Sequence, residues 1–524
     1  MPIPVIIGVT GHRDLQQGSI PALRKLVRGE LEKIKSLCPD SELIMLSSIA
    51  AGADSLCAEE ALSLGFRLVC PLPVDAEIYR KDFSEEEAET FESLLASADK
   101  IFVAPDYESF EDSRDFRFRQ AGIYIAEHCH VLLALWDGSP AKQGGCGTAE
   151  AVDFALNRSY ENSKKDFSPS NVAVVQIATP RASRQQDFEP YVRLIENETG
   201  SLEKILKQTN EFNRECKSVN TAEKVLLPCA GKPQSFMNLE KCNAQAAALS
   251  RSYQKKYLKS LRLLSGFCVM LVLSYLLYDE ADFLMMLPVY GIILIFYYFV
   301  YRRILRGKYH SNYISYRMLA ESLRVQTFMS ALGIKENAAR FYTWTQKEET
   351  AWIESAINAL SGNTDNFRAD DKLVQKLWIE GQLEYHKSAY IKNSKKDALA
   401  SNITTAMLVC TILLFAAVFV LEYFFRPLML STWLGISLRS WLKILWGSIS
   451  AVSLFVSGYL GNLSFSRKAE DNQKMAGVFS LAKRKCSQPG ADVKDICLAL
   501  AEEEIIENGS WASYCKENRP MFNL

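Results

Sequence analysis

The chain has 524 residues and a mass of 59.1 kDa, which is too long for one ordinary globular core, so we expect two or more domains. Its 60 Lys and Arg against 61 Asp and Glu leave a net charge of −1, which excludes a strongly basic protein drawn to nucleic acid by its overall field. Its 13 cysteines form no CxxC pair, so neither a disulfide framework nor a zinc ribbon is expected, and a reducing compartment is indicated.

Residues 1 to about 180 alternate strand and helix patterns. Amphipathic segments separate six nearly continuous apolar runs of strand length: VIIGVT, ELIMLSS, FRLVCPL, KIFVAP, HVLLALW and NVAVVQIA. Apolar strands linked by helices are typical of a parallel sheet covered on both faces. The sequence therefore predicts an α/β Rossmann-like domain. Because the chain opens directly into the first run, we expect no signal peptide.

Glycine-rich and polar segments follow four of these strands, at the edge where parallel sheets bind ligands. The expected ligand contacts are Gly8, Thr10, Gly11, His12 and Arg13 at the first strand, Ser48, Gly52 and Asp54 after the second, Tyr79 and Asp82 after the third, and Asp137, Gly144, Gly145, Gly147, Thr148 and Glu150 after the fifth. The glycines permit tight turns, and a glycine-rich loop that enters a helix presents N–H groups to a phosphate.

Each of these signals is weak alone, because Asp54 is more often a helix cap and His12 and Arg13 are often solvated. All four lie at one edge of one sheet, and together they predict a phosphorylated nucleotide ligand. The GxxxxGK[ST] motif of Walker-type ATPases is absent from the sequence. We expect no metal and no resident cofactor besides the nucleotide.

Residues 181–250 are polar and are predicted to be a helical connector. The helical pattern resumes at Phe236 and is expected to run through Arg251 into an apolar segment, either as a rod that carries movement or as a plain stalk. Residues 309–390 carry spaced apolar positions and predict a cytoplasmic helical layer, which could serve homo-oligomerisation. The C-terminal segment from EDNQKM, at 470–475, to about residue 511 could join this layer.

Four apolar stretches lie near 263–278, 283–301, 403–425 and 441–460. About 20 helical residues cross the hydrocarbon of a bilayer, and soluble core helices rarely run this long without a charge. We therefore predict four transmembrane helices in two hairpins rather than a soluble bundle. The boundaries that follow are 1–180 for the α/β domain, 181–250 for the connector, 251–400 for the first hairpin with its helical layer, and 401–524 for the second hairpin with the C-terminal helices.

In each hairpin, basic residues precede the first span and follow the second span. An acidic turn at 279–282 joins the first pair of spans. The positive-inside rule then predicts both termini in the cytoplasm of an inner-membrane protein, although Arg426, Arg439 and Lys443 oppose this for the second hairpin. Glu422 is expected to pair with Arg426 on the surface. The expected interfacial anchors are Tyr297, Tyr298, Tyr301, Trp433, Trp441 and Trp446.

The two hairpins have similar surroundings. A basic approach with tyrosines precedes each one, and a polar helix containing Ala-Glu follows each one. This pattern indicates either an internal duplication or a shared set of charge rules. The fourth span carries a small-residue stripe at Ser453, Ser457 and Gly461, which would serve close helix packing or line a pore in an oligomer.

Four segments in the first 180 residues, GVTGHRD, AAGADSL, PLPVDAEIYRKDF and WDG…GGCGT, resemble in that order the SLOG superfamily of nucleotide-binding domains. The remainder resembles the SLATT group of two-transmembrane effector domains, through YRMLAESLRVQTF, WIEGQLEYHKSAYIKNSKK and residues 507–511. The resemblance implies an effector of a bacterial antiphage conflict system. In that picture a nucleotide second messenger, cyclic or NAD-derived and made by a partner synthase, binds the SLOG domain, and the helices permeabilise the membrane.

One position departs from the hydrolytic members of that superfamily, whose motif is GGxGTxxE. Here the position of the catalytic Glu is Ala151, and the acid is Glu150, one residue earlier. One helical step turns a side chain by about 100°. We therefore expect a sensor rather than an enzyme. The alternatives are a membrane-anchored nucleotide hydrolase or glycosidase that uses Glu150 or Asp54, and a structural membrane scaffold.

Overall fold

The structure is a computed structural model, and it describes residues 3–111, 113–140, 145–158, 170–184, 188–197, 201–219, 225–334, 336–362 and 367–517. The chain forms two compact units, each assembled from separate segments. The first unit contains the residues up to Leu249 together with Arg317–Asp371 and Cys497–Trp511, and the second contains Ser250–Tyr316, Lys372–Ile496 and the residues from Ala512 on. Boundaries near 180, 250 and 400 stay a prediction.

The first unit contains the predicted α/β sheet, and the fold class is confirmed. Its strands are β1 (Val5–Gly11), β2 (Leu43–Leu46), β3 (Arg67–Leu72), β4 (Lys100–Val103), β5 (Val131–Trp136), β6 (Ala173–Ala178) and β7 (Val192–Ile195). They are ordered β4-β3-β2-β1-β5-β6-β7, and β1 to β6 are parallel. β7 pairs antiparallel with β6. The expectation that residues 181–250 are helical is wrong at β7, because a four-residue edge strand with two exposed positions is too polar to stand out.

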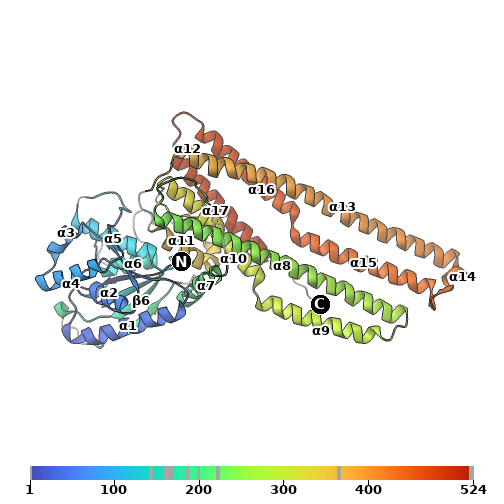
Figure 1. The fold of residues 1–524 in the computed structure, drawn as a ribbon, viewed down its shortest axis with the longest axis horizontal. Helices are drawn as coiled ribbons and strands as arrows, with labels where there is room; N and C mark the ends of the chain where they lie inside the picture. The colour runs from blue at the N-terminus through green and yellow to red at the C-terminus, as the bar shows by residue number, and fades with distance from the viewer. Residues whose placement is uncertain are drawn as a thin grey trace. The chain divides into compact units, whose positions relative to one another are not determined.

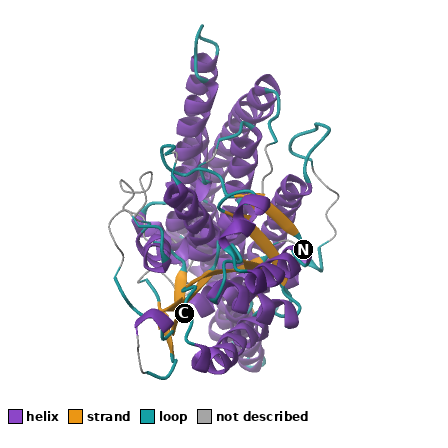
Figure 2. Ribbon diagram, turned by 90° about the vertical axis from the view of Figure 1, so that its left-hand side faces the viewer, coloured by secondary structure: helices purple, strands orange, loops and turns teal. Residues whose placement is uncertain are grey.

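Helices cover both faces of this sheet (Figure 2). Alternate residues of β1 separate the two sides, because side chains alternate along a strand. Val5, Ile7 and Val9 join the core beneath α1 (Ile20–Leu37), α2 (Ala53–Ser63), α4 (Glu85–Ala96) and α7 (Leu202–Cys216). Ile6 joins the opposite core, beneath α5 (Arg114–His128) and α6 (Thr148–Asn157). A short helix α3 (Ala76–Tyr79) follows β3.

A helical layer belongs to the same unit as the sheet. It contains the first turns of α8 (Gln234–Glu280), the end of α10 (Tyr309–Ala331), all of α11 (Trp344–Ser361) and most of α17 (Val493–Glu517). Polar contacts tie these helices together: Arg324 donates to Glu504 at 2.6 Å, and Asn508 donates to the Met318 carbonyl at 3.2 Å. The described residues of 317–371 and 497–511 therefore form a helical layer in the first unit, while 309–316 and 372–390 belong to the second unit. That this layer is cytoplasmic stays a prediction.

The second unit contains two helical hairpins (Figure 1). The later part of α8 pairs with α9 (Met286–Arg306), and α13 (Gly381–Phe424) pairs with α15 (Leu438–Leu463). A short α14 (Arg426–Met429) and the two-residue strands β8 (Thr432–Trp433) and β9 (Ile436–Ser437) connect α13 to α15. α12 (Asp371–Val374) and a π-helical stretch Gln375–Glu380 lead into α13. Four helices are long and apolar enough to cross a membrane, as predicted.

The two hairpins share one plan. α8, α9 and α10 have 47, 21 and 23 residues, and α13, α15 and α16 (Phe465–Cys486) have 44, 26 and 22. In each hairpin a residue other than glycine adopts a left-handed conformation just before the third helix: Lys308 with φ +46° and Ser464 with φ +47°. The repeated lengths and the repeated break support the predicted internal duplication.

The connections at the far ends of the spans hold paired charges. Glu422 accepts a hydrogen bond from Arg439 Nε at 3.1 Å, so the expected pairing with Arg426 is wrong, because the return helix brings Arg439 to this carboxylate. Lys443 contacts Glu280 at 3.1 Å. Two of the three cations that oppose the positive-inside rule are therefore neutralised. The orientation of the termini stays a prediction.

Of the small residues in α15, Gly447 packs closely. A Cβ there would lie 2.9 Å from a methyl group of Leu276 on α8, so this glycine permits close contact between the two hairpins. A Cβ at Gly461 would meet nothing within 4 Å. Close packing is therefore observed at Gly447, before the predicted stripe, and the role of the stripe itself stays a prediction.

Candidate functional site

A cavity of about 490 Å³ lies at the carboxyl edge of the sheet in the first unit. Its walls come from the residues after β1, β5 and β6, the loop before α2, the inner face of α5 and the first turn of α6. This is the edge at which open α/β sheets bind ligands, and the volume lies in the usual range for small-molecule sites. The parallel order of β2, β1 and β5 is what brings these loops together.

Eleven of the predicted contact residues line this cavity: Thr10, Gly11, His12, Arg13, Ser48, Asp54, Tyr79, Gly145, Gly147, Thr148 and Glu150. Gly8, Gly52, Asp82 and Asp137 do not line it, and Gly144 lies outside the described residues. A Cβ on Gly8 would lie 2.7 Å from Ile125, so this glycine lets α5 approach β1. Asp82 pairs with Arg114. That the lining residues contact a ligand stays a prediction.

Two glycines interlock the loops after β1 and β2. Gly52 has φ +85°, and a Cβ there would lie 2.4 Å from the Arg13 carbonyl oxygen. A Cβ on Gly11 would lie 2.2 Å from the Ala53 Cβ, and the Ala53 N–H donates to the His12 carbonyl at 3.1 Å. Because no side chain separates the two loops, they hold the cation of Arg13 and the carboxyl of Asp54 in the same cavity.

Arg13 differs from the other arginines of the cavity. Among the described residues, it makes no ion pair; its contacts are the Tyr79 hydroxyl at 3.5 Å and the Phe118 ring at 5.4 Å. The other three each bond a carboxylate: Arg119 with Glu108 at 2.7 Å, Arg181 with Asp14 at 3.0 Å and Arg184 with Asp137 at 3.1 Å. An exposed guanidinium that lines a cavity without a carboxylate partner is suited to bind an anion.

Asp54 is the second unusual group of the cavity. Burial raises the pKa of its carboxyl to about 7, against the opposing effects of a hydrogen bond from the Ala50 backbone and of the Arg13 cation. A carboxyl that titrates near neutral pH inside a cavity can accept or donate a proton there. Because it lies at the start of α2, its position is fixed by the interlocked loops.

His12 is held by Asp137 from outside the cavity. His12 Nε2 lies 3.2 Å from the Asp137 backbone nitrogen and 3.2 Å from Oδ1 of the Asp137 carboxylate, so Asp137 fixes the position of the ring. Burial and then the nearby Arg181 lower the pKa of His12. Burial acts to raise the pKa of Asp137, but hydrogen bonds from Ser139 and the contact with His12 hold it at about 2. Asp137 therefore positions His12, and its predicted contact with a ligand stays a prediction.

Glu150 occupies the N-terminus of α6. Its Oε2 accepts the Gly147 N–H at 3.0 Å, which is the N3 part of a capping arrangement. The expectation that this N–H is open to a phosphate is therefore wrong in this state, because a carboxylate of the same helix already takes it. Glu150 is 7% exposed and still lines the cavity.

Sequence reasoning missed three cavity arginines. Arg181 and Arg184 follow β6 in the stretch TPRASR, so the rule applied to four other strands would have found them. Arg119 lies within α5, and its position on the inner face was not visible without the packing of that helix. Among the described residues, no group of three His, Cys, Asp or Glu could hold a metal ion.

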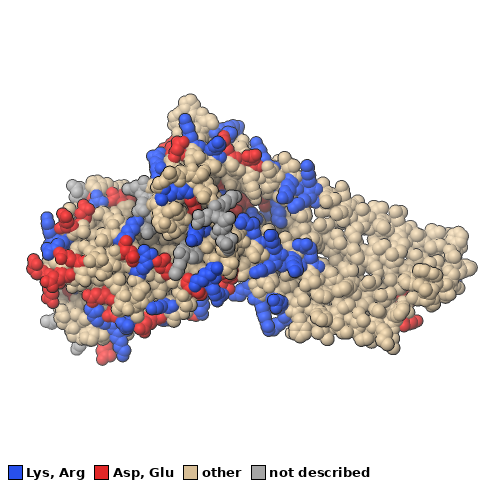
Figure 3. Space-filling model, in the orientation of Figure 1, with Lys and Arg blue, Asp and Glu red and all other residues tan. Residues whose placement is uncertain are grey.

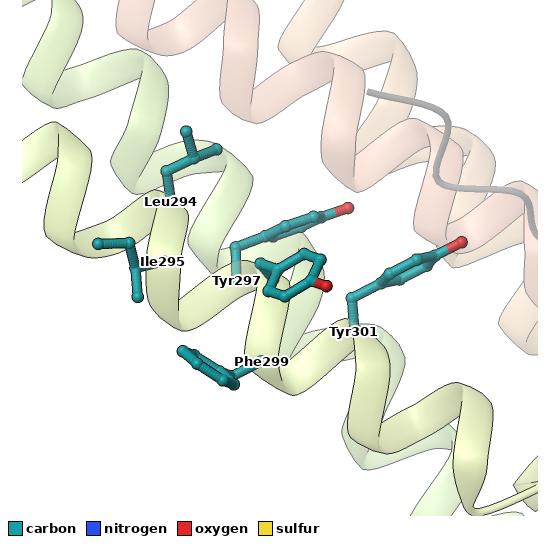
Figure 4. A pocket seen from close by; sticks show the side chains of 6 residues that line it. Leu294, Ile295, Tyr297, Phe299 and Tyr301 are labelled. Atoms are coloured by element: carbon teal, nitrogen blue, oxygen red, sulfur yellow. The ribbon is translucent and has the colours of Figure 1, made fainter.

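A second hollow of about 510 Å³ lies on α9 in the second unit, and its chemistry differs. Figure 4 shows Leu294, Ile295, Tyr297, Phe299 and Tyr301 around it, with Tyr298 completing the lining. The rings of Tyr297 and Tyr301 are stacked, 6.3 Å apart. The lining carries no charge and lies on a helix apolar enough to cross a membrane, so it suits hydrocarbon rather than a nucleotide.

Comparison with known proteins leaves the family open. No family model matches the chain, and no curated protein is significantly similar to it. What the structure itself establishes is a mostly parallel α/β sheet with a polar cavity at its carboxyl edge, in a chain with four helices able to span a membrane.

Proposed function

We propose that this chain is a membrane effector whose α/β domain senses a phosphorylated nucleotide and whose four apolar helices permeabilise the membrane in response. The observation that carries the proposal is Arg13, which lines the cavity and makes no ion pair among the described residues. The order of the GVTGHRD, AAGADSL and GGCGT segments, which resembles SLOG domains, supports a nucleotide signal as the ligand.

The aromatic groups of the cavity suit the rest of a nucleotide. Phe118, Tyr79 and Trp136 offer apolar surface for a base, and Ser48 and Asp54 offer groups for a ribose hydroxyl. The phosphate would lie against Arg13 and the first turn of α6, whose early N–H groups have no partner within the helix. The ligand would be cyclic or NAD-derived, and its source a partner synthase.

Such contacts can supply the free energy that is needed to shift the protein between a resting and an active state. Moving a two-state equilibrium from 1:99 to 99:1 takes about 5.5 kcal/mol of differential affinity. Two or three charge-assisted hydrogen bonds at about 1.5–3 kcal/mol each supply this when one state alone makes them. The proposal therefore requires the cavity to differ between a resting and an active state of the protein.

A ligand screen tests the sensing step. The full chain in detergent is titrated with cyclic nucleotides and NAD derivatives, and thermal unfolding reports binding. We expect Arg13→Ala to weaken binding at least tenfold, because a charge-assisted contact of about 1.5–3 kcal/mol is lost. Arg193→Ala, at an exposed arginine on β7, is the matched control and should bind normally. Equal binding by Arg13→Ala and wild type would contradict the proposal.

Liposome leakage tests the output. Protein in dye-filled liposomes should release dye when the stabilising nucleotide is added, and Arg13→Ala should need at least tenfold more of it. Binding without any leakage would leave a nucleotide-binding membrane protein and would remove the permeabilising role.

A membrane-anchored nucleotide hydrolase or glycosidase is the second candidate. Asp54 favours it, because a carboxyl with a pKa of about 7 beside Arg13 is suited to general acid–base catalysis. Incubation with the same nucleotides distinguishes the two. Product formation that is lost in Asp54→Asn or Glu150→Ala would establish the enzyme, and unchanged nucleotide would exclude it for the compounds tested.

A further inference from the structure

Lysine and arginine gather at one end of the apolar helices of the second unit. Residues 251–262 of α8, 302–308 after the span in α9, and 387–396 of α13 contain thirteen Lys and Arg and no Asp or Glu. We call these three segments the basic collar. All thirteen side chains are exposed. In Figure 3, blue side chains gather where the tan, uncharged surface of the helices begins.

These cations have no carboxylate partners within the described part of the chain. Their contacts are with rings and backbone: Lys256 lies 4.7 Å from the Tyr253 ring, Lys396 lies 5.4 Å from the Phe465 ring, and Arg262 donates to a carbonyl of its own helix at 3.3 Å. By contrast, Arg24, Arg67 and Arg80 of the sheet domain each contact a carboxylate. The collar is therefore an uncompensated positive surface.

The position of the collar identifies its partner. The chain enters exposed apolar surface directly after residue 262 and leaves it directly before residue 302, with Leu263, Ile295 and Phe299 exposed. Tyr297 and Tyr301 lie in the last turns before the cations, as interfacial tyrosines do. When the spans lie in hydrocarbon, the collar lies at the depth of the lipid headgroups. Lysine and arginine reach that depth along their apolar stems.

We propose that the basic collar binds the headgroups of anionic phospholipids, so that the chain selects phosphatidylglycerol-like lipids over zwitterionic ones. Thirteen cations spread over three helix ends match a charged surface better than a single ion, which would require convergent donors. Each cation near an anionic surface contributes about fivefold in affinity, and the effect falls with salt. This inference does not depend on nucleotide sensing.

The test compares the full chain with two triple variants in vesicles of equal phosphatidylglycerol and phosphatidylcholine content. Native mass spectrometry counts the lipids that stay bound to each. Arg302→Gln, Arg303→Gln and Arg306→Gln together remove three collar cations. Lys25→Gln, Lys81→Gln and Lys204→Gln remove three exposed cations of the sheet domain and are the matched control.

We expect wild type and the control to retain phosphatidylglycerol preferentially, and the collar variant to lose roughly fivefold in preference for each cation removed. Equal retention of the two lipids by wild type, or equal losses in both triple variants, would overturn the proposal. Inorganic phosphate is added as a competitor, and displacement of the lipid by phosphate alone would show a simple anion site instead. Should the collar variant fail to insert, the same measurement on wild type at low and high salt decides, because headgroup binding must weaken with salt.

Discussion

The two hairpins repeat one plan but are buried differently. In the first, α8 and α10 extend into the same compact unit as the sheet, where Phe236, Leu239 and Leu323 are fully buried. In the second, α13 has no buried residue, and α16 contacts α13 along an apolar stripe that includes Met475 and Phe479. The turns of α8 and α10 beyond the apolar spans are core helices of the first unit, whereas α13 and α16 form a two-helix layer within the second unit.

This difference shows how two hairpins of similar plan are buried in different ways. A helix buried on several sides needs apolar residues all round, while a helix in a two-helix layer needs only a stripe. The first hairpin is therefore built into the unit that holds the cavity, and the second is free of that constraint. Substitutions of buried residues in the two hairpins should therefore lower the stability of different units.

The largest effect is expected from two buried phenylalanines, Phe236 of α8 and Phe479 of α16. Phe236 packs against Phe367 with ring centroids 4.9 Å apart, and Phe479 stacks on His386 at 5.5 Å; both are fully buried. Phe236→Ala and Phe479→Ala should each cost about 3–5 kcal/mol, but in different units. Hydrogen exchange measures this: Phe236→Ala should expose the amides of β1 and β5, and Phe479→Ala should leave them protected. Equal hydrogen exchange of the β1 and β5 amides in both variants would contradict the claim that the two hairpins stabilise different units.

A smaller effect is expected at the buried acid of α11. Glu354 accepts a hydrogen bond from Arg158 Nη2 at 2.8 Å and another from Asn171, and all three are buried. Glu354→Gln should lower the free energy of unfolding of the first unit by about 1.5–3 kcal/mol, because a charged hydrogen bond is lost and Arg158 keeps only its longer contact with Glu127, at 3.8 Å. Thermal unfolding of the full chain in detergent measures it.

The matched control for this variant lies in the second unit. Glu380 pairs with Lys483 at 2.7 Å on the surface, where solvent screens the charges. Glu380→Gln should therefore give no resolvable change. A shift as large as that of Glu354→Gln would mean that the two units are stabilised in the same way.

The last prediction concerns pH and Asp54. Its folded pKa, about 7, lies above the unfolded value near 3.9. The stability that it contributes is therefore complete below about pH 4 and is lost as the pH rises through about 7, at no more than about 1.4 kcal/mol per pH unit. Asp54→Asn should reduce the change in the unfolding temperature of the first unit between pH 5 and pH 8. Asp495→Asn, at an exposed carboxyl of α17, should leave this pH dependence unchanged. A wild-type unfolding temperature that does not vary with pH would contradict the raised pKa of Asp54.

Much of the fold could be predicted because the signals are local. Six strands and four spans follow from runs of apolar residues, which need no knowledge of partners. β7 was missed because an edge strand buries little, and the union of α11 and α17 with the sheet was missed because it depends on contacts between residues far apart in sequence, such as Glu354 with Arg158.

The candidate site was predictable to the extent that it lies at strand ends. Arg13, Asp54 and Thr148 were found from their loops, and the parallel order of the strands brings them to one cavity. The roles of individual groups were not predictable, because they depend on hydrogen-bond partners that the sequence does not show. Asp137 contacts His12, Glu150 caps its own helix, and Arg119 donates to Glu108.

The presence of two hairpins has a consequence for stoichiometry. Within the described residues, one chain carries two hairpins and one cavity at the carboxyl edge of its sheet. If the proposed function holds, an assembly of identical copies contains twice as many hairpins as nucleotide sites, and each bound nucleotide would act on two hairpins.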